Sequence, residues 1–230
     1  MIRISTAPGK LLGLATLLLA AASTSWAATV FDNTATNRSQ VFPVATYTVG
    51  GSSVTVTEIG DQVTLSGSDR RITDMLVGYA LTSANTNRNE TATLNIYKDN
   101  ASGVPATLLF SSAPVTLTLA PNGAEAIFQG ISADLQGANT VTWMINFGGV
   151  DAGETVGLVL FGNPTIGVSF DDIWVRAGGT FELKNIPGAF QPEAFYARII
   201  AVPEPNTLAL LVLGGVACLG FRQLLRRRTV

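Results

Sequence analysis

The chain has 230 residues and a formal net charge of −2, and it contains no histidine and a single cysteine, Cys218. Ser-His-Asp and Cys-His nucleophilic sites are therefore excluded, and so are zinc sites built on His or Cys. Residues 28–202 hold 8 of the 14 basic and 15 of the 16 acidic residues, and this negative charge argues against nucleic acid or anionic lipid as a partner.

The first 27 residues have the three parts of a secretory signal peptide. Arg3 and Lys10 make the leader positive, residues 11–22 are an apolar run, and Ser25 and Ala27 are small residues where a signal peptidase reads the chain. We expect a signal helix that signal peptidase removes by cleavage after Ala27. The mature chain then begins outside the cytoplasm.

Residues 28–202 are enough for one domain with its own core. Apolar residues recur at every second position in 92–97, 115–119, 141–147 and 195–199, which is the pattern of strands with one buried face. Gly, Asn and Asp residues mark turns between these runs. We expect an all-β domain of about ten to twelve short strands, an antiparallel two-sheet sandwich of jelly-roll type.

The strongest candidate for a site in this domain is the cluster of Asp171 and Asp172, followed by Trp174. One interpretation is a loop whose carboxylates bind a cation, or a tryptophan that faces a carbohydrate beside hydrogen-bonding neighbours. The other is a corner of the sandwich, in which one aspartate caps a turn and Trp174 is buried. We favour the corner because tryptophan is so often mostly buried.

Asp99 and Asn100, together with Ser102, offer oxygen ligands of the kind that calcium prefers. The spacing of an EF-hand is missing, however, and Asp or Asn before a glycine is what a hairpin loop needs. We therefore favour a turn here. Calcium is the one cofactor that the residues suggest, and no metal site is assigned.

The acidic residues are too numerous for a pair of them to indicate a glycosidase. Among 15 carboxylates on one domain, two at about 5–10 Å from each other occur by chance. Tyr97 and Tyr196 lie on predicted outward faces, where aromatic rings can stack on sugars, although exposed tyrosines are ordinary on a sheet. We expect no enzymatic activity.

The C-terminal segment, residues 203–230, joins a stiff connector to a short apolar span. Pro203 and Pro205 disfavour helix, whereas residues 207–221 carry no charge. As a helix these 15 residues are about 22 Å long, against about 30 Å of hydrocarbon. We expect a transmembrane helix over about 207–225, lengthened by snorkelling of Arg222 toward the headgroups.

A basic cluster follows this span and predicts its orientation. The positive-inside rule puts these residues in the cytoplasm and the body on the far side of the membrane, which agrees with the signal peptide. The cluster consists of Arg222, Arg226, Arg227 and Arg228.

Pro203, Glu204 and Pro205, then a short apolar span, then terminal arginines form an arrangement that resembles the PEP-CTERM sorting signal. That signal occurs on exported proteins of Gram-negative bacteria that make exopolysaccharide. The resemblance implies an exosortase, a membrane transpeptidase-like enzyme, as a partner that removes the tail and delivers the body to the surface or matrix. The alternative is an ordinary anchor that stays in the inner membrane.

Short segments of the body are similar, in the same order, to a group of PEP-CTERM proteins whose exported domain has no established activity. The resemblance implies no catalytic residue. The segments are residues 60–70, 96–100, 143–147, 157–161 and 167–174.

We therefore expect a structural or adhesive protein that begins as an inner-membrane precursor with its body in the periplasm. After processing it would reach the cell surface or exopolysaccharide matrix of a Gram-negative bacterium, with extracellular polysaccharide as its partner. The alternative is a carbohydrate-binding module of the envelope, with or without calcium. An envelope glycosidase is the least favoured interpretation.

Overall fold

The structure is a computed structural model that describes residues 27–35, 40–43, 46–49, 52–82, 89–151, 154–170, 173–184 and 194–203. Within it, Ala27–Val202 form one unit with their own internal contacts. The predicted signal helix and transmembrane helix lie outside the described residues. In the ranges just given, no helix is long and apolar enough to span a membrane.

The described part of the chain is built from β-strands, several of them shorter than five residues. In chain order they are β1 (Ala28–Asp32), β2 (Gln40–Pro43), β3 (Thr46–Val49), β4 (Ser52–Thr64), β5 (Arg71–Thr82), β6 (Thr91–Asp99), β7 (Pro105–Ser111), β8 (Val115–Thr116), β9 (Ala120–Asp134), β10 (Thr140–Gly148), β11 (Thr155–Phe161), β12 (Val168–Ser169), β13 (Ile173–Ala177), β14 (Thr180–Lys184), β15 (Ala194–Phe195) and β16 (Ala197–Val202).

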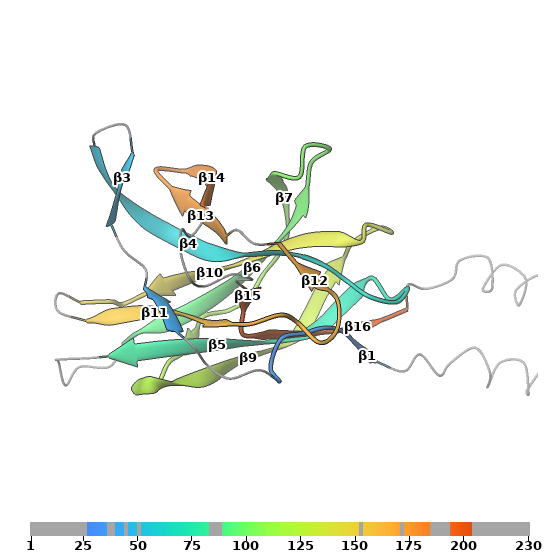
Figure 1. Ribbon diagram of the computed structural model, residues 1–230, viewed down its shortest axis with the longest axis horizontal. Helices are drawn as coiled ribbons and strands as arrows, with labels where there is room; N and C mark the ends of the chain where they lie inside the picture. Colours follow the sequence, from blue (N-terminus) through green and yellow to red (C-terminus); the bar gives the residue numbers. More distant parts are fainter. Residues whose placement is uncertain are drawn as a thin grey trace, which may run out of the picture. The chain divides into compact units, whose positions relative to one another are not determined.

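These strands form two layers, which we call the β5 sheet and the β10 sheet (Figure 1). The seven-stranded β5 sheet has the order β1-β16-β5-β11-β15, with β9 also on β5 and β2 on β11. The nine-stranded β10 sheet has the order β14-β13-β4-β10-β6-β7, with β3 and β12 on β4 and β8 on β6. Pairings such as β10 with β6 and β5 with β9 are antiparallel. The predicted antiparallel two-sheet sandwich is confirmed.

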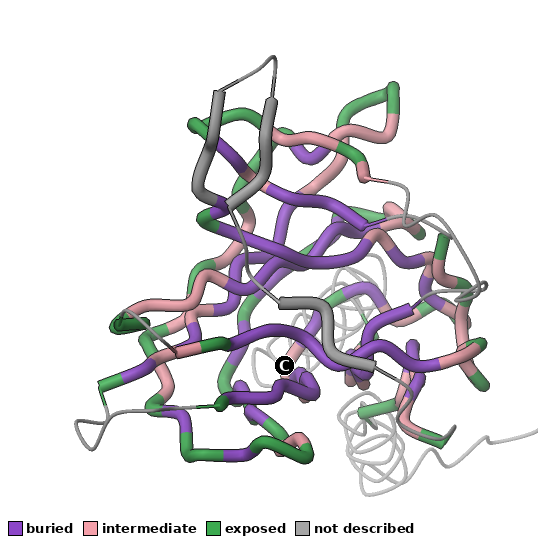
Figure 2. The backbone as a smooth tube through the Cα atoms, turned by 60° about the vertical axis from the view of Figure 1, so that its left-hand side comes forward, coloured by how far each residue is buried: buried purple, intermediate pink, exposed green. Residues whose placement is uncertain are grey.

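The core lies between the sheets, where inward-facing residues at alternate strand positions meet. On β6, Ala92, Leu94 and Ile96 are at most 1% exposed, as the period of two predicts. Trp143 of β10 packs edge-on against Phe195 of β15, with 6.0 Å between ring centroids, and so links the two sheets. Such a pair is worth about 0.5–1.5 kcal/mol beyond the burial of its surface. Figure 2 shows buried backbone along the strands and exposed backbone at many of the turns between them.

Residues 65–70 close the end of the sandwich at which β1 begins. Arg70 is buried, and its Nε and Nη2 donate to Oδ1 of Asn139 at 3.1 and 2.6 Å. Nη2 also donates to the carbonyl of Gly67 at 2.7 Å. The backbone N–H of Ser66 donates to the carbonyl of Val30 at 2.8 Å. The loop is thereby held against β1.

Candidate functional site

Four polar side chains meet on the outer face of the β10 sheet, the face turned away from the core. Glu58 comes from β4, Asn95 and Tyr97 from β6, and Arg176 from β13; we call them the Glu58 cluster. Arg176 stands opposite Glu58 in the β13–β4 register. Because β10 lies between β4 and β6, the side chains of β6 reach Glu58 across one strand.

The carboxylate of Glu58 accepts three hydrogen bonds although the residue is only 4% exposed. Nη1 of Arg176 donates to Oε1 at 2.7 Å. The hydroxyl of Tyr97 and Nδ2 of Asn95 donate to Oε2 at 2.8 and 3.2 Å. Both oxygens are thus engaged within the chain, as a buried charge requires.

The β13–β14 hairpin covers this cluster with an aromatic ring. Phe181 of β14 lies edge-on to Tyr97, with 5.0 Å between centroids. The guanidinium carbon of Arg176 lies 5.2 Å from the centroid of Phe181, within cation–π range. The cover explains why Tyr97 is 5% exposed despite facing away from the core.

Two members of the cluster have pKa values shifted upward. Burial first, and then the hydrogen bond to Glu58, raises the pKa of Tyr97 far above its ordinary range. The hydrogen bond to Glu58 also raises the pKa of Arg176, against an opposing effect of burial. Both donors therefore keep their protons at physiological pH. This is the behaviour of a fixed polar network rather than of a group that exchanges protons in catalysis.

Asp99 lies at the end of β6 on the same outer face. Its Oδ1 accepts a hydrogen bond from Oγ1 of Thr142 at 2.7 Å, and its Oδ2 accepts one from Nε2 of Gln62 at 2.9 Å. Gln62 also donates to the carbonyl of Gly103 at 2.7 Å. Burial raises the pKa of Asp99, and the hydrogen bonds from Thr142 and Gln62 act in the opposite direction.

Asn100, the other predicted calcium ligand, turns into its own loop. Its Oδ1 accepts hydrogen bonds from the backbone N–H groups of Ser102 and Val104 at 2.8 and 3.1 Å, which is an Asx turn. Asp99 and Asn100 thus direct their oxygens to different partners. Among the residues that the structure describes, no group of three or more His, Cys, Asp or Glu side chains could hold a metal ion.

Trp174 of β13 lies near the Glu58 cluster and is 5% exposed. It forms a small apolar cluster with Tyr97 and Met144 on the outer face of the β10 sheet. A ring this deeply buried offers no stacking surface to a sugar. Asp171 and Asp172, which complete this predicted site, lie outside the described residues.

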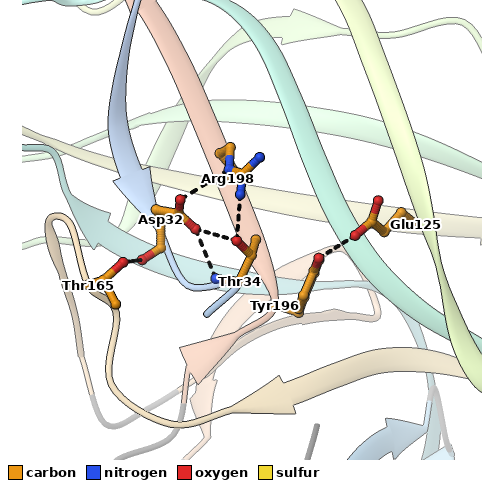
Figure 3. Close-up of polar contacts among 6 residues, drawn as sticks. All are labelled: Asp32, Thr34, Glu125, Thr165, Tyr196 and Arg198. Atoms are coloured by element: carbon orange, nitrogen blue, oxygen red, sulfur yellow. Dashed lines mark hydrogen bonds and ion pairs between the residues drawn. The ribbon is translucent and has the colours of Figure 1, made fainter. Parts of the chain in front are cut away.

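A second polar cluster, which the sequence did not reveal, ties β1 to β16 in the β5 sheet (Figure 3). Nε of Arg198 donates to Oδ2 of Asp32, its register partner, at 3.1 Å. Thr34 donates to Oδ1 of Asp32 from its N–H and its hydroxyl at 2.9 and 2.6 Å, and accepts from Nη2 of Arg198 at 2.7 Å. The hydroxyl of Thr165 donates to the carbonyl of Asp32 at 3.2 Å.

Tyr196 lies on the outer face of the β5 sheet, where its hydroxyl donates to Oε1 of Glu125 on β9 (Figure 3). Its side chain lies over Gly78 of β5, so that a Cβ at position 78 would come within 2.8 Å of three atoms of Tyr196. Phe161 packs edge-on to the same ring at 4.6 Å. Tyr196 is consequently 8% exposed, so neither of the two predicted outward tyrosines offers an open ring.

The predicted signal cleavage site and the predicted sorting motif adjoin the first and last strands of the sandwich. Ala27 is exposed and immediately precedes β1, and Pro203 is exposed and immediately follows β16. Glu204 and Pro205 lie outside the described residues. The same holds for the basic cluster Arg222, Arg226, Arg227 and Arg228.

Comparison with known proteins identifies the C-terminal segment. The family model of the PEP-CTERM protein-sorting motif matches residues 201–228, which confirms the predicted sorting signal. No curated protein matches the chain. Among solved structures, a chain in the structure of infectious bursal disease virus Gt strain is similar over 80% of this chain, with 11% sequence identity and a TM-score of 0.28. This protein spans 42% of that chain.

Proposed function

We propose that the sandwich is a structural or adhesive component of the cell surface or exopolysaccharide matrix of a Gram-negative bacterium. The PEP-CTERM motif at residues 201–228 implies an exported protein that an exosortase sorts and processes. The proposal adds the destination and the role, with extracellular polysaccharide as the partner. Before processing, the protein would be an inner-membrane precursor with its body in the periplasm.

The observation that carries this proposal is the direct junction of fold and sorting motif. The motif begins at residue 201, and β16 ends at Val202. The sorting motif is therefore joined directly to the last strand of the sandwich. A role that needs only a stable exported body is the simplest one for such an arrangement.

The aromatic residues on the outer face of the β10 sheet support a structural role over a carbohydrate-binding module. Tyr97 and Trp174 do lie on one face of the β10 sheet, but Phe181 and its hairpin cover Tyr97, and Trp174 is buried. A sugar-binding platform needs open aromatic faces.

Glu58 and Asp99, the two carboxylates described on the outer face of the β10 sheet, give little support to an envelope glycosidase. Such an enzyme needs two free carboxyl groups on opposite sides of a bound sugar. In Glu58 and in Asp99, both carboxylate oxygens instead accept hydrogen bonds from donors of the chain. No calcium role is proposed for Asp99 and Asn100.

Intact mass of the protein from fractionated native cells tests the sorting step. The wild-type protein in the surface or matrix fraction should lack residues 1–27 and the tail. The double variant Pro203→Ala and Pro205→Ala should keep the tail and stay in the membrane. An uncut tail in both proteins, with both in the inner membrane, would leave a plain anchored domain and would overturn the matrix proposal.

Binding to the exopolysaccharide of the same cells separates the structural role from the module. A structural component should co-sediment with the polysaccharide gel and stay bound when free oligosaccharides are added. A binding module should be displaced by one oligosaccharide at a saturable concentration. Displacement of this kind would favour the alternative.

A further inference from the structure

The first and last strands of the sandwich are partners in the β5 sheet. The first adjoins the predicted signal cleavage site, and the last adjoins the predicted sorting motif. β1 starts at Ala28, one residue after Ala27, and β16 ends at Val202, one residue before Pro203. Ala28 and Ala201 are register partners in this antiparallel pair. Partner Cα atoms in such a pair lie about 4.5–5.5 Å apart. The chain therefore enters and leaves the fold at neighbouring points (Figure 1).

The connectors between the sandwich and the two apolar runs are both short. Residues 203–206 separate β16 from the uncharged run at 207–221, and four residues reach about 14 Å at most. On the other side, residues 23–27 separate the apolar run of the signal peptide from β1, and five residues reach about 18 Å. A sandwich attached at both ends must therefore keep both junctions close to the same membrane.

The length of the sandwich makes this condition strict. β5 has 12 residues, which span about 40 Å. Had the chain entered at one end of such a strand and left at the other, two short connectors could have reached one membrane only with the strand lying along its surface. The pairing of Ala28 with Ala201 removes this restriction.

β16 is also indispensable to the fold. It lies between β1 and β5, and Ile199 and Ala201 are fully buried. On the β1 side, the N–H of Asn33 donates to the carbonyl of Ala197 at 2.8 Å, and Nδ2 of Asn33 donates to the carbonyl of Phe195 at 3.1 Å. The sandwich can close only when the chain next to the sorting motif has been exported.

We propose that the precursor folds its sandwich while the signal peptide and the sorting segment are both still attached, so that signal peptidase and exosortase act on a folded body. The pairing of Ala28 with Ala201 allows this, because it brings the two points at which these segments join the sandwich to the same end of the sheet. The inference rests on the proposed export and processing, but not on the role in the matrix.

A cysteine pair in the full chain tests the proposal. Ala28→Cys and Ala201→Cys place two thiols at partner positions, within the range in which a disulfide forms, and Cys218→Ser removes the native thiol. Ala27→Leu blocks the signal cut, because signal peptidase needs a small residue there. Pro203→Ala and Pro205→Ala block the tail cut. The chain that carries both blocks is oxidised with diamide in spheroplasts, and the bridge is read as a loss of alkylation by intact mass.

The bridge should form in the doubly blocked precursor to within about twofold of the processed protein. It should form about tenfold more than in the control Thr29→Cys with Ala201→Cys, whose side chains point to opposite faces. A bridge in the processed protein only would overturn the proposal. Protease resistance of the blocked precursor without added cysteines gives a second readout, and a body that is degraded in the blocked precursor but resistant in the processed protein would also overturn it.

The two proposals fail separately. A processed protein that never reaches the matrix would end the proposed role and leave the order of folding and cutting intact. A precursor that stays unfolded would end the present inference and leave the role intact.

Discussion

Arg176 and Glu58 are register partners on β13 and β4, and their ion pair is unequally buried. The carboxylate belongs to a residue that is 4% exposed, whereas the side chain of Arg176 is 37% exposed. The two halves of the pair therefore differ in what their loss leaves behind. Without Arg176 a buried carboxylate loses its cation, and without the charge of Glu58 the guanidinium can turn to water.

Arg176→Met should therefore destabilise the mature protein more than Glu58→Gln. We expect a loss of about 1–3 kcal/mol in the free energy of unfolding for Arg176→Met, which is below the cost of breaking a fully buried pair because Arg176 is partly solvated. Glu58→Gln keeps the acceptor for Tyr97 and should cost less than about 1 kcal/mol. Urea unfolding measures both.

The double variant supplies the control for this prediction. In the Glu58→Gln background, Arg176→Met leaves no uncompensated charge and should cost clearly less than it does alone. Equal costs in both backgrounds would show that Arg176 acts through packing on Phe181 instead.

Arg198→Met offers a contrast at the other ion pair. Arg198 and Asp32 have side chains that are 41% and 17% exposed, so that solvent screens their attraction. We expect a loss below about 1 kcal/mol, measured by the same urea titration. A loss as large as that of Arg176→Met would mean that the link between β1 and β16 depends on this cluster rather than on the ladder and the core.

Alternation along the strands predicts which way a side chain points but not what covers it. Tyr97 and Tyr196 lie on the outer faces, as the period of two indicates, yet both are buried. Their covers, Phe181 and Phe161, are 84 and 35 residues away in the sequence. No local pattern encodes such contacts, because they depend on how the hairpins fold back over the sheets.

Local chemistry predicts the turn at Asn100 but not the burial of Glu58. The Asx turn uses donors at Ser102 and Val104, which lie within four residues of Asn100. The partners of Glu58 are 37, 39 and 118 residues away. The only local signal for this cluster is a charged residue, Glu58, within a run whose pattern predicts a strand. That pattern does not indicate which residues pair with Glu58.

Asp99 should give the stability of the protein a defined dependence on pH. Burial raises the pKa of Asp99 above its ordinary value of 3.8. Between that value and the raised one, the folded state holds a proton that the unfolded state has lost, so that a rise in pH favours unfolding. The contribution of Asp99 is fully present below about pH 3.8 and is lost as the pH rises through the folded pKa.

Asp99→Asn removes this titration. The free energy of unfolding of the wild type minus that of Asp99→Asn should therefore fall as the pH rises above about 3.8, as read from urea unfolding. The same change at the exposed Asp134 controls for the loss of one negative charge. A difference that rises with pH would contradict the prediction, because it would mean that the hydrogen bonds from Thr142 and Gln62 outweigh burial.

Gly78 should be intolerant of even one methyl group because the ring of Tyr196 occupies the space above it. A Cβ there meets Cβ, Cγ and Cδ1 of Tyr196 at 2.8 Å, and these atoms belong to the rigid base of the ring. Phe161 packs on the same ring, which limits its retreat. We expect Gly78→Ala to cost about 1–3 kcal/mol by overpacking.

Two variants of Tyr196 isolate the cause of that cost. Tyr196→Phe removes only the hydroxyl that donates to Glu125, so Gly78→Ala should be as costly in that background as in the wild type. Tyr196→Ala removes Cγ and the ring but keeps Cβ, so Gly78→Ala should cost clearly less in that background than in the wild type. An undiminished cost with Tyr196→Ala would assign the intolerance of position 78 to Cβ of residue 196 or to the backbone of β5 and not to the ring.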